Sequence, residues 1–472
     1  MNIQEMTWHR LFSQSFYKNK KLPLGEMSFL RDFAGNVPGD LYPQLQKSDD
    51  CVESVENGGY HLLSGSSRRL IGQYFPYASY EVSFSAPAGQ CGFVFQIPSS
   101  QVSILCDRDS ITFRAEGCVE TLSLPAANRR TLIVTCRRQN FDVYFAENGV
   151  TRHFHTFVAE GFCGCDAQAV FQKGFVSLSA AAPVDIFAAS FYLDCGVGQA
   201  DLRPVCYENG EVLHEGGKVY MTFSIRMEAD GIQGIFSWVP GTAQLELAGA
   251  LFFDCGDGAW RNYIASSLVY HRMEQKWYIW TSAFENQRRL ARGSCEGDPR
   301  FGINLIDVTL MDAAGEGDDY SDFVGFPGDE DPDFYYSEKE KKWYLAVCRI
   351  VPDTNAYRYA FFTSDNFFDG FRYIGCGKDG AETGGSFVMA DGQQFFVCGN
   401  DFGKRANYRV YSRDGMRDAA FDFDDGGFRG WGSVIPVKVG SRTRYFWITF
   451  DRHKGSSYTW SYGNIYCFEG VI

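Results

Sequence analysis

The sequence predicts an all-β protein in which an N-terminal jelly-roll β-sandwich is followed by a five-bladed β-propeller. Aromatic residues make up 16% of the 472 residues and there are 50 glycines, a composition that favours pleated strands joined by tight turns. Five segments also repeat one pattern: a polar or glycine entry, an aromatic pair (Val-Tyr in the first) and an apolar run. They are GKVYMTFSIR (217–226), QKWYIWTSAF (275–284), KKWYLAVCRI (341–350), GQQFFVCGND (392–401) and RTRYFWITFD (442–451). Such recurrence is typical of propeller blades.

Residues 1–26 form a polar N-terminal segment, within which we expect a helix around 7–17. The segment has no uninterrupted apolar core of the kind that a signal peptide needs. The whole chain has no run of ~18 apolar residues, so the sequence predicts no membrane span.

Residues 27–196 are predicted to form the β-sandwich, because short runs alternate apolar and polar residues with turn residues between them. No helical crossover fits between the runs, so we expect antiparallel pairing. The expected strands are 80–86, 91–97, 102–107, 110–116, 130–138, 141–147, 174–180 and 185–194.

A glycine-rich hinge at 195–204 then leads to the propeller at 205–472. An acidic, glycine-rich insert at 311–322 is interpreted as a surface loop between the second and third blades. The expected blades are 205–253, 254–310, 322–376, 377–430 and 431–472.

The net charge and the cysteine content narrow the classes of binding partner and the cellular compartment that we expect. The net charge of −14 disfavours nucleic acid, whose phosphates an acidic surface repels. It suits a neutral ligand held among carboxylates, and it equally serves ordinary solubility. The 15 cysteines are scattered without zinc-ligand spacing, which indicates reduced thiols and a cytoplasmic protein.

In a propeller, the loop that enters each innermost strand faces the central funnel. These loops should lie about ten residues before each aromatic pair. Carboxylates occur there in the first four blades. The segments are 207–211, 257–263, 328–334, 381–387 and 429–433.

The Asp-Pro at 331–332, followed by a strand and KKWYL at 341–345, resembles the third blade of five-bladed glycoside hydrolases. These are the arabinanase/xylosidase and the invertase/levansucrase enzymes. The resemblance implies that Asp331 is an orienting, pKa-tuning carboxylate and that Glu382 is the general acid. The invertase group has an Arg where Glu330 stands, which argues against a simple fructan substrate.

The same families place a base or nucleophile Asp at the start of the first inner strand. Aligning the strand at 217–220 with theirs puts Asn209 at that point, and an amide cannot act as a carboxylate base. Glu211 lies on the same face of an extended strand as Asn209, so we expect Glu211 to be the substitute base.

Further residues are expected to bind substrate: Arg261, Asn262, Asn400, Asp401, Arg405 and Trp431. No cofactor is expected, although a calcium ion at the centre, as in some related enzymes, stays open. The sandwich resembles concanavalin-like lectin and laminin-G jelly rolls. That resemblance implies either a carbohydrate-binding module or a packing partner for the propeller.

The expected function is hydrolysis that releases a terminal sugar from an oligosaccharide or small glycoside. Inversion is favoured, which needs carboxylates ~6.5–9.5 Å apart, whereas retention needs ~5–5.5 Å. Two alternatives stay open. One is a glycoside phosphorylase with Arg261, Arg405, Arg429 and Arg452 as phosphate ligands; the other is a non-catalytic sugar-binding protein. The sequence identifies neither the sugar nor the oligomeric state.

Overall fold

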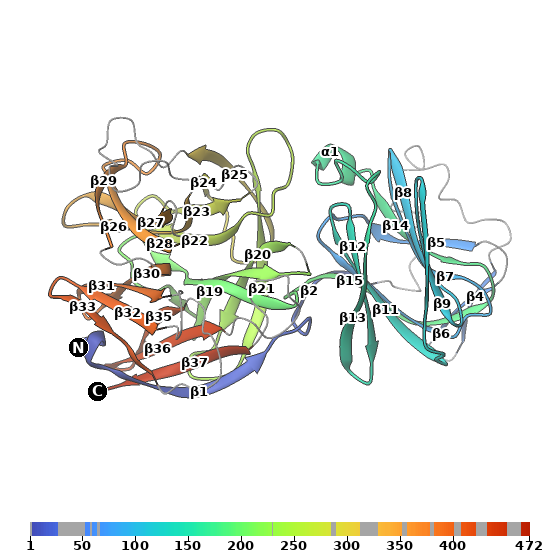
Figure 1. Cartoon of the computed structure of the whole chain (residues 1–472), viewed down its shortest axis with the longest axis horizontal. Coiled ribbons are helices and arrows are strands. Elements are labelled where there is room, and N and C mark those ends of the chain that lie inside the picture. The colour runs from blue at the N-terminus through green and yellow to red at the C-terminus, as the bar shows by residue number, and fades with distance from the viewer. Residues whose placement is uncertain are drawn as a thin grey trace. The chain divides into compact units, whose positions relative to one another are not determined.

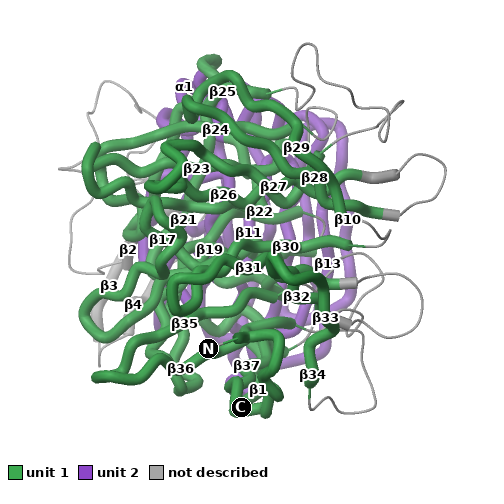
Figure 2. The backbone as a smooth tube through the Cα atoms, turned by 90° about the vertical axis from the view of Figure 1, so that its left-hand side faces the viewer, with its two compact units in different colours: residues 1–20, 195–257, 261–472 green, residues 21–194, 258–260 purple. Residues whose placement is uncertain are grey.

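The computed structural model describes residues 2–26, 52–56, 59–63, 67–228, 230–284, 289–311, 329–351, 356–377, 382–400, 407–421, 432–450 and 464–472. The chain divides into two compact units (Figure 2), the first comprising 1–20, 195–257 and 261–472 and the second 21–194 and 258–260. The helical elements among the described residues are the 3-10 turn η1 (Ile3–Glu5) and α1 (Gln168–Phe171). None of the described helices has the length and apolar character needed to cross a membrane.

The second unit contains two antiparallel sheets that share one hydrophobic core. Rings from the two sheets meet in it, as where Tyr80 lies edge-on to Phe95 with centroids 5.4 Å apart. One sheet has the order β10 (Cys118–Ser123), β9 (Ser110–Ala115), β8 (Ser100–Cys106), β7 (Cys91–Ile97), β14 (Phe175–Ala180), β5 (Ser67–Gln73). The other has β13 (Val150–Val158), β12 (Asn140–Glu147), β11 (Arg129–Arg137), β6 (Ser79–Ser85), β15 (Val184–Asp194), β4 (Gly59–Leu63), β3 (Val52–Glu56), with β2 (Lys21–Glu26) paired to β15. Each strand predicted for this region is present.

The first unit is a five-bladed β-propeller (Figure 1). Its five inner strands contact one another in a closed ring, because each touches the inner strand of the next blade and the fifth touches the first. These strands are β16 (Gly198–Pro204), β22 (Ile264–His271), β26 (Asp329–Ser337), β30 (Glu382–Ala390) and β35 (Ser433–Val439). The repeated aromatic segments supply the second strand of each blade: β19 (Lys218–Arg226), β23 (Lys276–Ala283), β27 (Lys342–Val351), β31 (Gln393–Asn400) and β36 (Arg442–Phe450).

The outer strands complete the blades. In the first two blades the outermost strands pair in parallel, β21 with β25, so these blades form one continuous sheet. The outer strands are β20 (Gly231–Trp238) and β21 (Leu245–Asp254), β24 (Arg289–Cys295) and β25 (Gly302–Met311), β28 (Ala356–Ser364) and β29 (Arg372–Cys376), and β32 (Asn407–Ser412) and β33 (Gly415–Asp418). The short strands β17 (Cys206–Tyr207) and β18 (His214–Glu215) lie between β16 and β19.

The N-terminus closes the propeller, which corrects the helix expected at 7–17. Those residues form β1 (Thr7–Ser15), which pairs with β37 (Asn464–Val471) as the fourth strand of blade five; β34 (Ala420–Phe421) pairs with its other edge. Figure 1 shows β1, in blue, beside β37, in red. The fully buried Trp8 packs in this blade against Trp447 with centroids 5.1 Å apart. A helix would leave the edge of β37 unpaired, so tertiary pairing overrides the local pattern.

The propeller also begins earlier than residue 205. The segment expected to be a hinge at 195–204 contains β16, the inner strand of blade one. Residues 1–20 likewise belong to the propeller unit, so the N-terminal segment of 1–26 is divided between the two units at residue 20.

Candidate functional site at the propeller hub

Two aspartates occupy equivalent positions at the starts of inner strands. In four of the five inner strands the pairing with the second strand shifts register near the start, which marks a β-bulge. A left-handed residue stands at each bulge: Asp201 (φ 52°), Ala265 (φ 55°), Asp331 (φ 52°) and Gly384 (φ 59°). Left-handed non-glycine residues are uncommon and concentrate at functional sites. The bulges in blades one and three therefore present an aspartate each to the hub.

Asp331 is buried in a setting that favours its protonated form. Its backbone N–H donates to Ser282 Oγ at 2.9 Å, and Thr383 Oγ1 donates to its Oδ2 at 3.3 Å. Burial, and then the negative charge of Asp201, raise the pKa of Asp331 from 3.8 to about 6, against the opposing charge of Arg203. Asp331 is therefore a carboxyl that can hold a proton close to neutral pH.

Asp201 forms an ion pair with a cation from the second strand of its blade. Arg226, at the end of β19, donates from Nη2 to Asp201 Oδ2 at 3.0 Å, and the Asp201 side chain is 5% exposed. Asp201 thus lies at the start of the first inner strand, where the related hydrolases were expected to carry their base. The expectation that this strand begins near Asn209 is wrong, because β16 begins at Gly198.

Loop length explains why the sequence search missed Asp201. Thirteen residues separate β16 from β19, whereas four separate β22 from β23 and β26 from β27. Counting a fixed number of residues back from the aromatic pair therefore ends within this longer connection and does not reach β16. Comparing 201–204, Asp-Leu-Arg-Pro, with 331–333, Asp-Pro-Asp, would have aligned the two bulges.

Glu382 begins the inner strand of blade four, and its carboxylate is already engaged. Arg409 donates from Nη1 to Glu382 Oε1 at 3.0 Å, and the Tyr411 hydroxyl donates to the same oxygen. Both donors lie on β32, the third strand of the blade, so the side chain reaches along its own blade. Neighbouring Thr383 contacts Asp331, so the structure brings the starts of β26 and β30 together. Sequence reasoning missed Arg409 and Tyr411, which nothing in their local pattern distinguishes.

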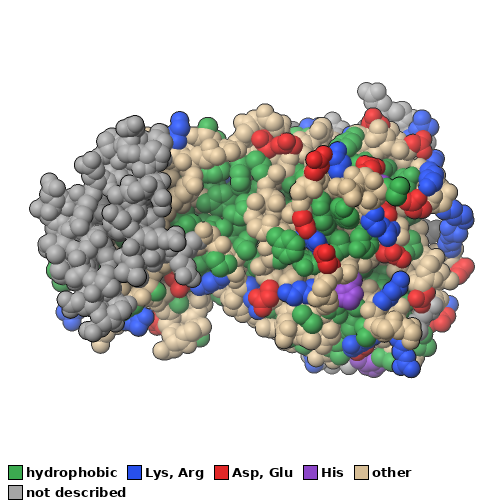
Figure 3. All heavy atoms as spheres, turned by 180° about the vertical axis from the view of Figure 1, so that it is seen from behind, with side chains coloured by type: hydrophobic (Ala, Val, Ile, Leu, Met, Phe, Trp, Pro, Cys, Tyr) green, Lys and Arg blue, Asp and Glu red, His purple; other side chains and the backbone are tan. Residues whose placement is uncertain are grey.

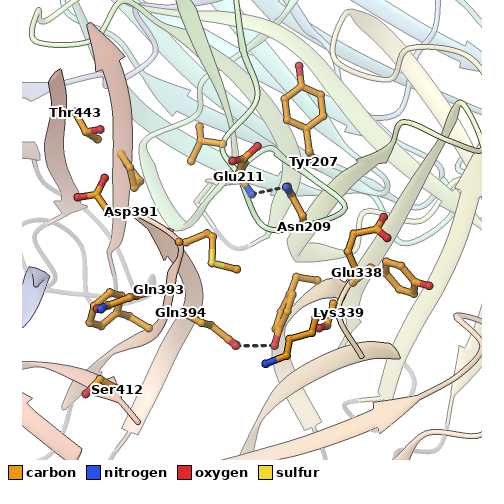
Figure 4. Close-up of a pocket in the computed structure, with 18 of the residues that line it drawn as sticks. Tyr207, Asn209, Glu211, Glu338, Lys339, Asp391, Gln393, Gln394, Ser412 and Thr443 are labelled. Carbon is orange, nitrogen blue, oxygen red and sulfur yellow. Dashed lines mark hydrogen bonds between the residues drawn. The ribbon is translucent and has the colours of Figure 1, made fainter. Parts of the chain in front are cut away.

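Glu211 lies toward the other end of the inner strands (Figure 4). It lines a cavity of about 990 Å³ together with Tyr335 and Tyr336, near the end of β26. Tyr335 stands four positions after Asp331 along the strand, a rise of roughly 13 Å. The backbone N–H of Glu211 donates to Asn209 Oδ1 at 3.1 Å, which closes the turn. The structure therefore does not bring Glu211 to Asp331 or Glu382.

Glu208, in the same turn, is anchored rather than reactive. It accepts from Arg272 Nε at 2.8 Å, and Arg272 lowers the pKa of Glu208 although burial opposes the shift. The Tyr336 backbone N–H donates to the Glu208 carbonyl at 2.5 Å. The α-carbon of Gly210 lies close to Met389 and Tyr335, where an added Cβ would stand 3.7 Å from each. The turn therefore ties blade one to blades two and three.

The expected substrate-binding residues divide into two groups. Arg261 donates from Nη1 to Asp257 Oδ1 at 2.7 Å, and Asn262 Nδ2 donates to Asp230 Oδ1 and to the Gly231 carbonyl, both at 2.7 Å. These donors are used within the propeller. Asn400 is the last residue of β31, and its backbone pairs with that of Glu382. The structure does not describe the side chain of Asn400. Asp401, Arg405, Arg429, Trp431 and Arg452 lie outside the described residues.

Beneath the two aspartates lies a second buried layer, two residues further along the inner strands. Its members include Arg203, Ser267 and Asp333. Asp333 Oδ1 accepts from Ser267 Oγ at 2.5 Å, and its Oδ2 accepts from the Phe387 N–H at 2.6 Å. Arg203, 1% exposed, donates from Nη1 to the Leu202 carbonyl at 2.9 Å. Sequence reasoning identified none of these residues as part of the site.

Glu330, Asp331 and Cys348 place one potential metal-ligand atom each within 4.8 Å of one another. The set does not fit calcium, which takes six to eight oxygen ligands. Burial, and then the charges of Glu330 and Asp331, raise the pKa of Cys348 well above its usual range, so the thiol is not a ready thiolate ligand either. All cysteines among the described residues are free thiols.

The surface view agrees with a mixed-charge protein. On the face in Figure 3, acidic and basic side chains are interspersed over the described part of the propeller unit, with no extended basic stripe on that face.

No protein-family model matches the sequence, and no curated protein matches it. Solved structures do match. They include a family 117 glycoside hydrolase from Zobellia galactanivorans (TM-score 0.40, 10% identity, 58% of this chain and 84% of that one). Bacillus subtilis levansucrase has a TM-score of 0.38 at 10% identity, over 58% of this chain and 86% of that one. The catalytic domain of Coprinopsis cinerea GH62 alpha-L-arabinofuranosidase has a TM-score of 0.35 at 10% identity, over 59% and 98%. The five-bladed architecture itself is established by the strand order described above.

Proposed function

We propose that this protein is a glycoside hydrolase whose reaction takes place at the hub, with Asp201 as the base. The observation that carries the proposal is the pair of aspartates at equivalent bulges of blades one and three. Arg226 pairs with Asp201, while burial and the charge of Asp201 favour a proton on Asp331. Glycosidic cleavage requires this combination of one ionised and one protonated carboxyl.

In the proposed reaction the base removes a proton from water, whose oxygen attacks the anomeric carbon. The acid gives its proton to the glycosidic oxygen as the bond from that oxygen to the anomeric carbon breaks. The products are the free sugar and an alcohol, and the two carboxyls have exchanged protonation states. Inversion at the anomeric carbon is part of the proposal, because water is the nucleophile.

Two residues compete for the role of acid. The family resemblance assigns it to Glu382, and the contacts in this structure favour Asp331. Arg409 and Tyr411 both donate to Oε1 of Glu382, so Glu382 would serve as the acid only after Arg409 and Tyr411 release it. Asp331 needs no such rearrangement to carry a proton.

The test is a panel of aryl glycosides and natural oligosaccharides, assayed with wild type and with Asp201→Asn, Asp331→Asn and Glu382→Gln. Loss of the base should abolish turnover of every substrate. Loss of the acid should remove turnover of natural oligosaccharides but spare aryl glycosides with a strongly acidic leaving group, which departs without protonation. Asp257→Asn, outside the hub, is the matched control. If Asp201→Asn keeps wild-type turnover on the substrate that the panel identifies, the proposed hub reaction is wrong.

Phosphorolysis and sugar binding without turnover are the other candidates. The guanidinium of Arg261 is paired with Asp257, which leaves it less suited to phosphate than the sequence implied. Assays with and without phosphate separate hydrolysis from phosphorolysis, and calorimetric sugar binding without turnover would indicate a binding protein. NMR of the first-released anomer tests inversion. A cytoplasmic location is proposed from the cysteine content alone.

A further inference from the structure

The cavity that Glu211 lines is separate from the hub aspartates. Tyr335 and Met389, which also line it, stand near the ends of β26 and β30, whereas Asp331 and Glu382 stand at or near the starts of those strands. Its volume of about 990 Å³ is at the upper end of the range, about 300–1,000 Å³, that small-molecule sites occupy. The cavity is therefore large enough to hold a ligand of its own.

The turn that carries Asn209 and Glu211 forms a rigid wall of this cavity. The Tyr207 N–H donates to the Glu211 carbonyl at 2.7 Å, and the Gly210 N–H donates to the Tyr207 carbonyl at 2.9 Å. Gly210 also packs closely against blades three and four. The side chains of the turn are therefore held in place before any ligand arrives, which lowers the entropic cost of binding.

Two amide side chains in the cavity use their oxygen within the protein. Asn209 Oδ1 accepts from the Glu211 N–H at 3.1 Å, and Gln394 Oε1 accepts from the Tyr335 hydroxyl at 2.7 Å. Neither Asn209 Nδ2 nor Gln394 Nε2 has a hydrogen-bond partner among the residues that the structure describes. Each amide is thus oriented by its oxygen and keeps its N–H donors for a ligand.

Glu211 supplies an acceptor near these donors. Its side chain is 48% exposed and lies 4.0 Å from Arg272 Nη1, so the carboxylate keeps lone pairs for a ligand. Figure 4 shows Asn209 and Glu211 above the open space and Gln394 below it. Apolar and aromatic side chains complete the lining: Tyr207, Val212, Tyr335, Tyr336, Met389, Phe395 and Pro436.

The charges around the cavity favour a neutral ligand. Both signs are interspersed: Lys339 stands between Glu338 and Glu340 in the chain, and Arg413 precedes Asp414. An anion or a cation would therefore meet no concentrated field of opposite sign. The charged side chains of the lining are five carboxylates, Glu211, Glu338, Glu340, Asp391 and Asp414, and three cations, Lys339, Arg413 and Lys438.

We propose that this cavity is a second binding site, which takes a neutral oligosaccharide through Asn209, Gln394 and Glu211. A hydroxyl group both donates and accepts, so adjoining hydroxyls of a sugar match amide donors near a carboxylate acceptor. The apolar faces of the sugar rings match the apolar lining. The inference does not depend on the proposed reaction at the hub, because a sugar can bind here whether or not the hub cleaves one.

The experiment is calorimetric titration of the full chain with neutral oligosaccharides built from glucose, galactose, xylose, arabinose or mannose. Asn209→Asp and Gln394→Glu keep the oxygen that is bonded within the protein and remove the N–H donors. Glu211→Gln removes the charged acceptor. Each variant should weaken binding by roughly three- to tenfold, the effect of one lost hydrogen bond.

Matched controls make the same exchanges outside the cavity. Gln244→Glu and Glu246→Gln alter exposed side chains of blade one that do not line it, and they should leave the affinity unchanged. Calorimetry on the Asp201→Asn background keeps the oligosaccharide intact if the hub reaction is as proposed.

Hydrogen exchange locates the bound sugar without any change in the cavity. On the same Asp201→Asn background, the oligosaccharide should slow exchange of backbone amides at 207–214 and 390–394, which include residues of the cavity wall. A ligand bound at the hub alone would instead slow exchange at the starts of the inner strands.

Three results would each overturn the inference. The first is that no neutral oligosaccharide of the panel binds. The second is that binding is unchanged in all three cavity variants and protection is confined to the hub. The third is that inorganic phosphate or an acidic oligosaccharide binds the cavity more tightly than every neutral one, which would mean that its cations select an anion.

The outcome is distinguishable from that of the proposed function. Binding at the cavity with no turnover of any substrate would reject the hub reaction and support the second site. Turnover that requires Asp201, with no binding at the cavity, would support the hub reaction and reject the second site.

Discussion

Replacing Asp331 by Asn should stabilise the protein at neutral pH, although it alters the proposed active site. The folded pKa of Asp331 is about 6, and its usual value is 3.8. The folded state therefore holds this proton more tightly than the unfolded state. The stabilisation from the protonated form is complete below pH 3.8 and is lost as the pH rises through 6. A difference of this size corresponds to roughly 3 kcal/mol at pH 8.

An Asn side chain has nearly the same shape and cannot be ionised, so it avoids this cost. The free energy of unfolding of Asp331→Asn relative to wild type should rise from pH 4 to pH 8 by up to ~3 kcal/mol. Urea unfolding followed by tryptophan fluorescence measures it. Asp329→Asn is the control on the same strand. It breaks a buried ion pair with Arg349 at 2.7 Å and should destabilise by ~3–5 kcal/mol. A pH-independent difference for Asp331→Asn would refute the reasoning.

Three further predictions concern the frame that carries the site. Trp8→Ala should destabilise the propeller by ~3–5 kcal/mol because a fully buried ring is lost from the closing strand, whereas Leu11→Ala, exposed on the same strand, should change thermal stability little. Gly196→Ala should be severely destabilising, since an added Cβ would lie 2.1 Å from the Arg226 carbonyl oxygen; Gly117→Ala, also at positive φ but in open space, should cost only ~1 kcal/mol in chemical unfolding. Asp142→Ala should destabilise the second unit by ~3–5 kcal/mol, because it leaves Arg137 buried without its carboxylate; equal thermal melting of variant and wild type would contradict this.

Features set by local pattern were predictable from the sequence. The aromatic-pair strands are buried in every blade, so their apolar runs recur and can be recognised one at a time. The same holds for the strands of the second unit, whose alternation follows from one buried face. The start of β26 near the Asp-Pro was also predictable from the sequence. A short turn joins β26 to β27, the second strand of the blade, so counting back from the aromatic pair reaches β26.

Which residues lie together at the hub was not predictable from local sequence patterns. Asp201 and Asp331 are 130 residues apart in the chain, and only the closure of five inner strands places both at one end of a ring. Because the connection between β16 and β19 is long, counting back from the aromatic pair of blade one led to Glu211 and did not reach Asp201 on β16. The pairing of Glu382 with Arg409 depends on how strands one and three of a blade pack, which neither segment encodes alone.

The sequence by itself determined that the chain forms strands, where most of them run and that they repeat as blades, because strand formation depends on nearby side chains. Only the tertiary structure decided which terminus completes blade five and which carboxylates share the hub. It also decided which of them is buried beside another charge. Those outcomes depend on contacts between residues far apart in the chain, and the ionisation of a carboxyl depends on the charges and solvent that those contacts place around it.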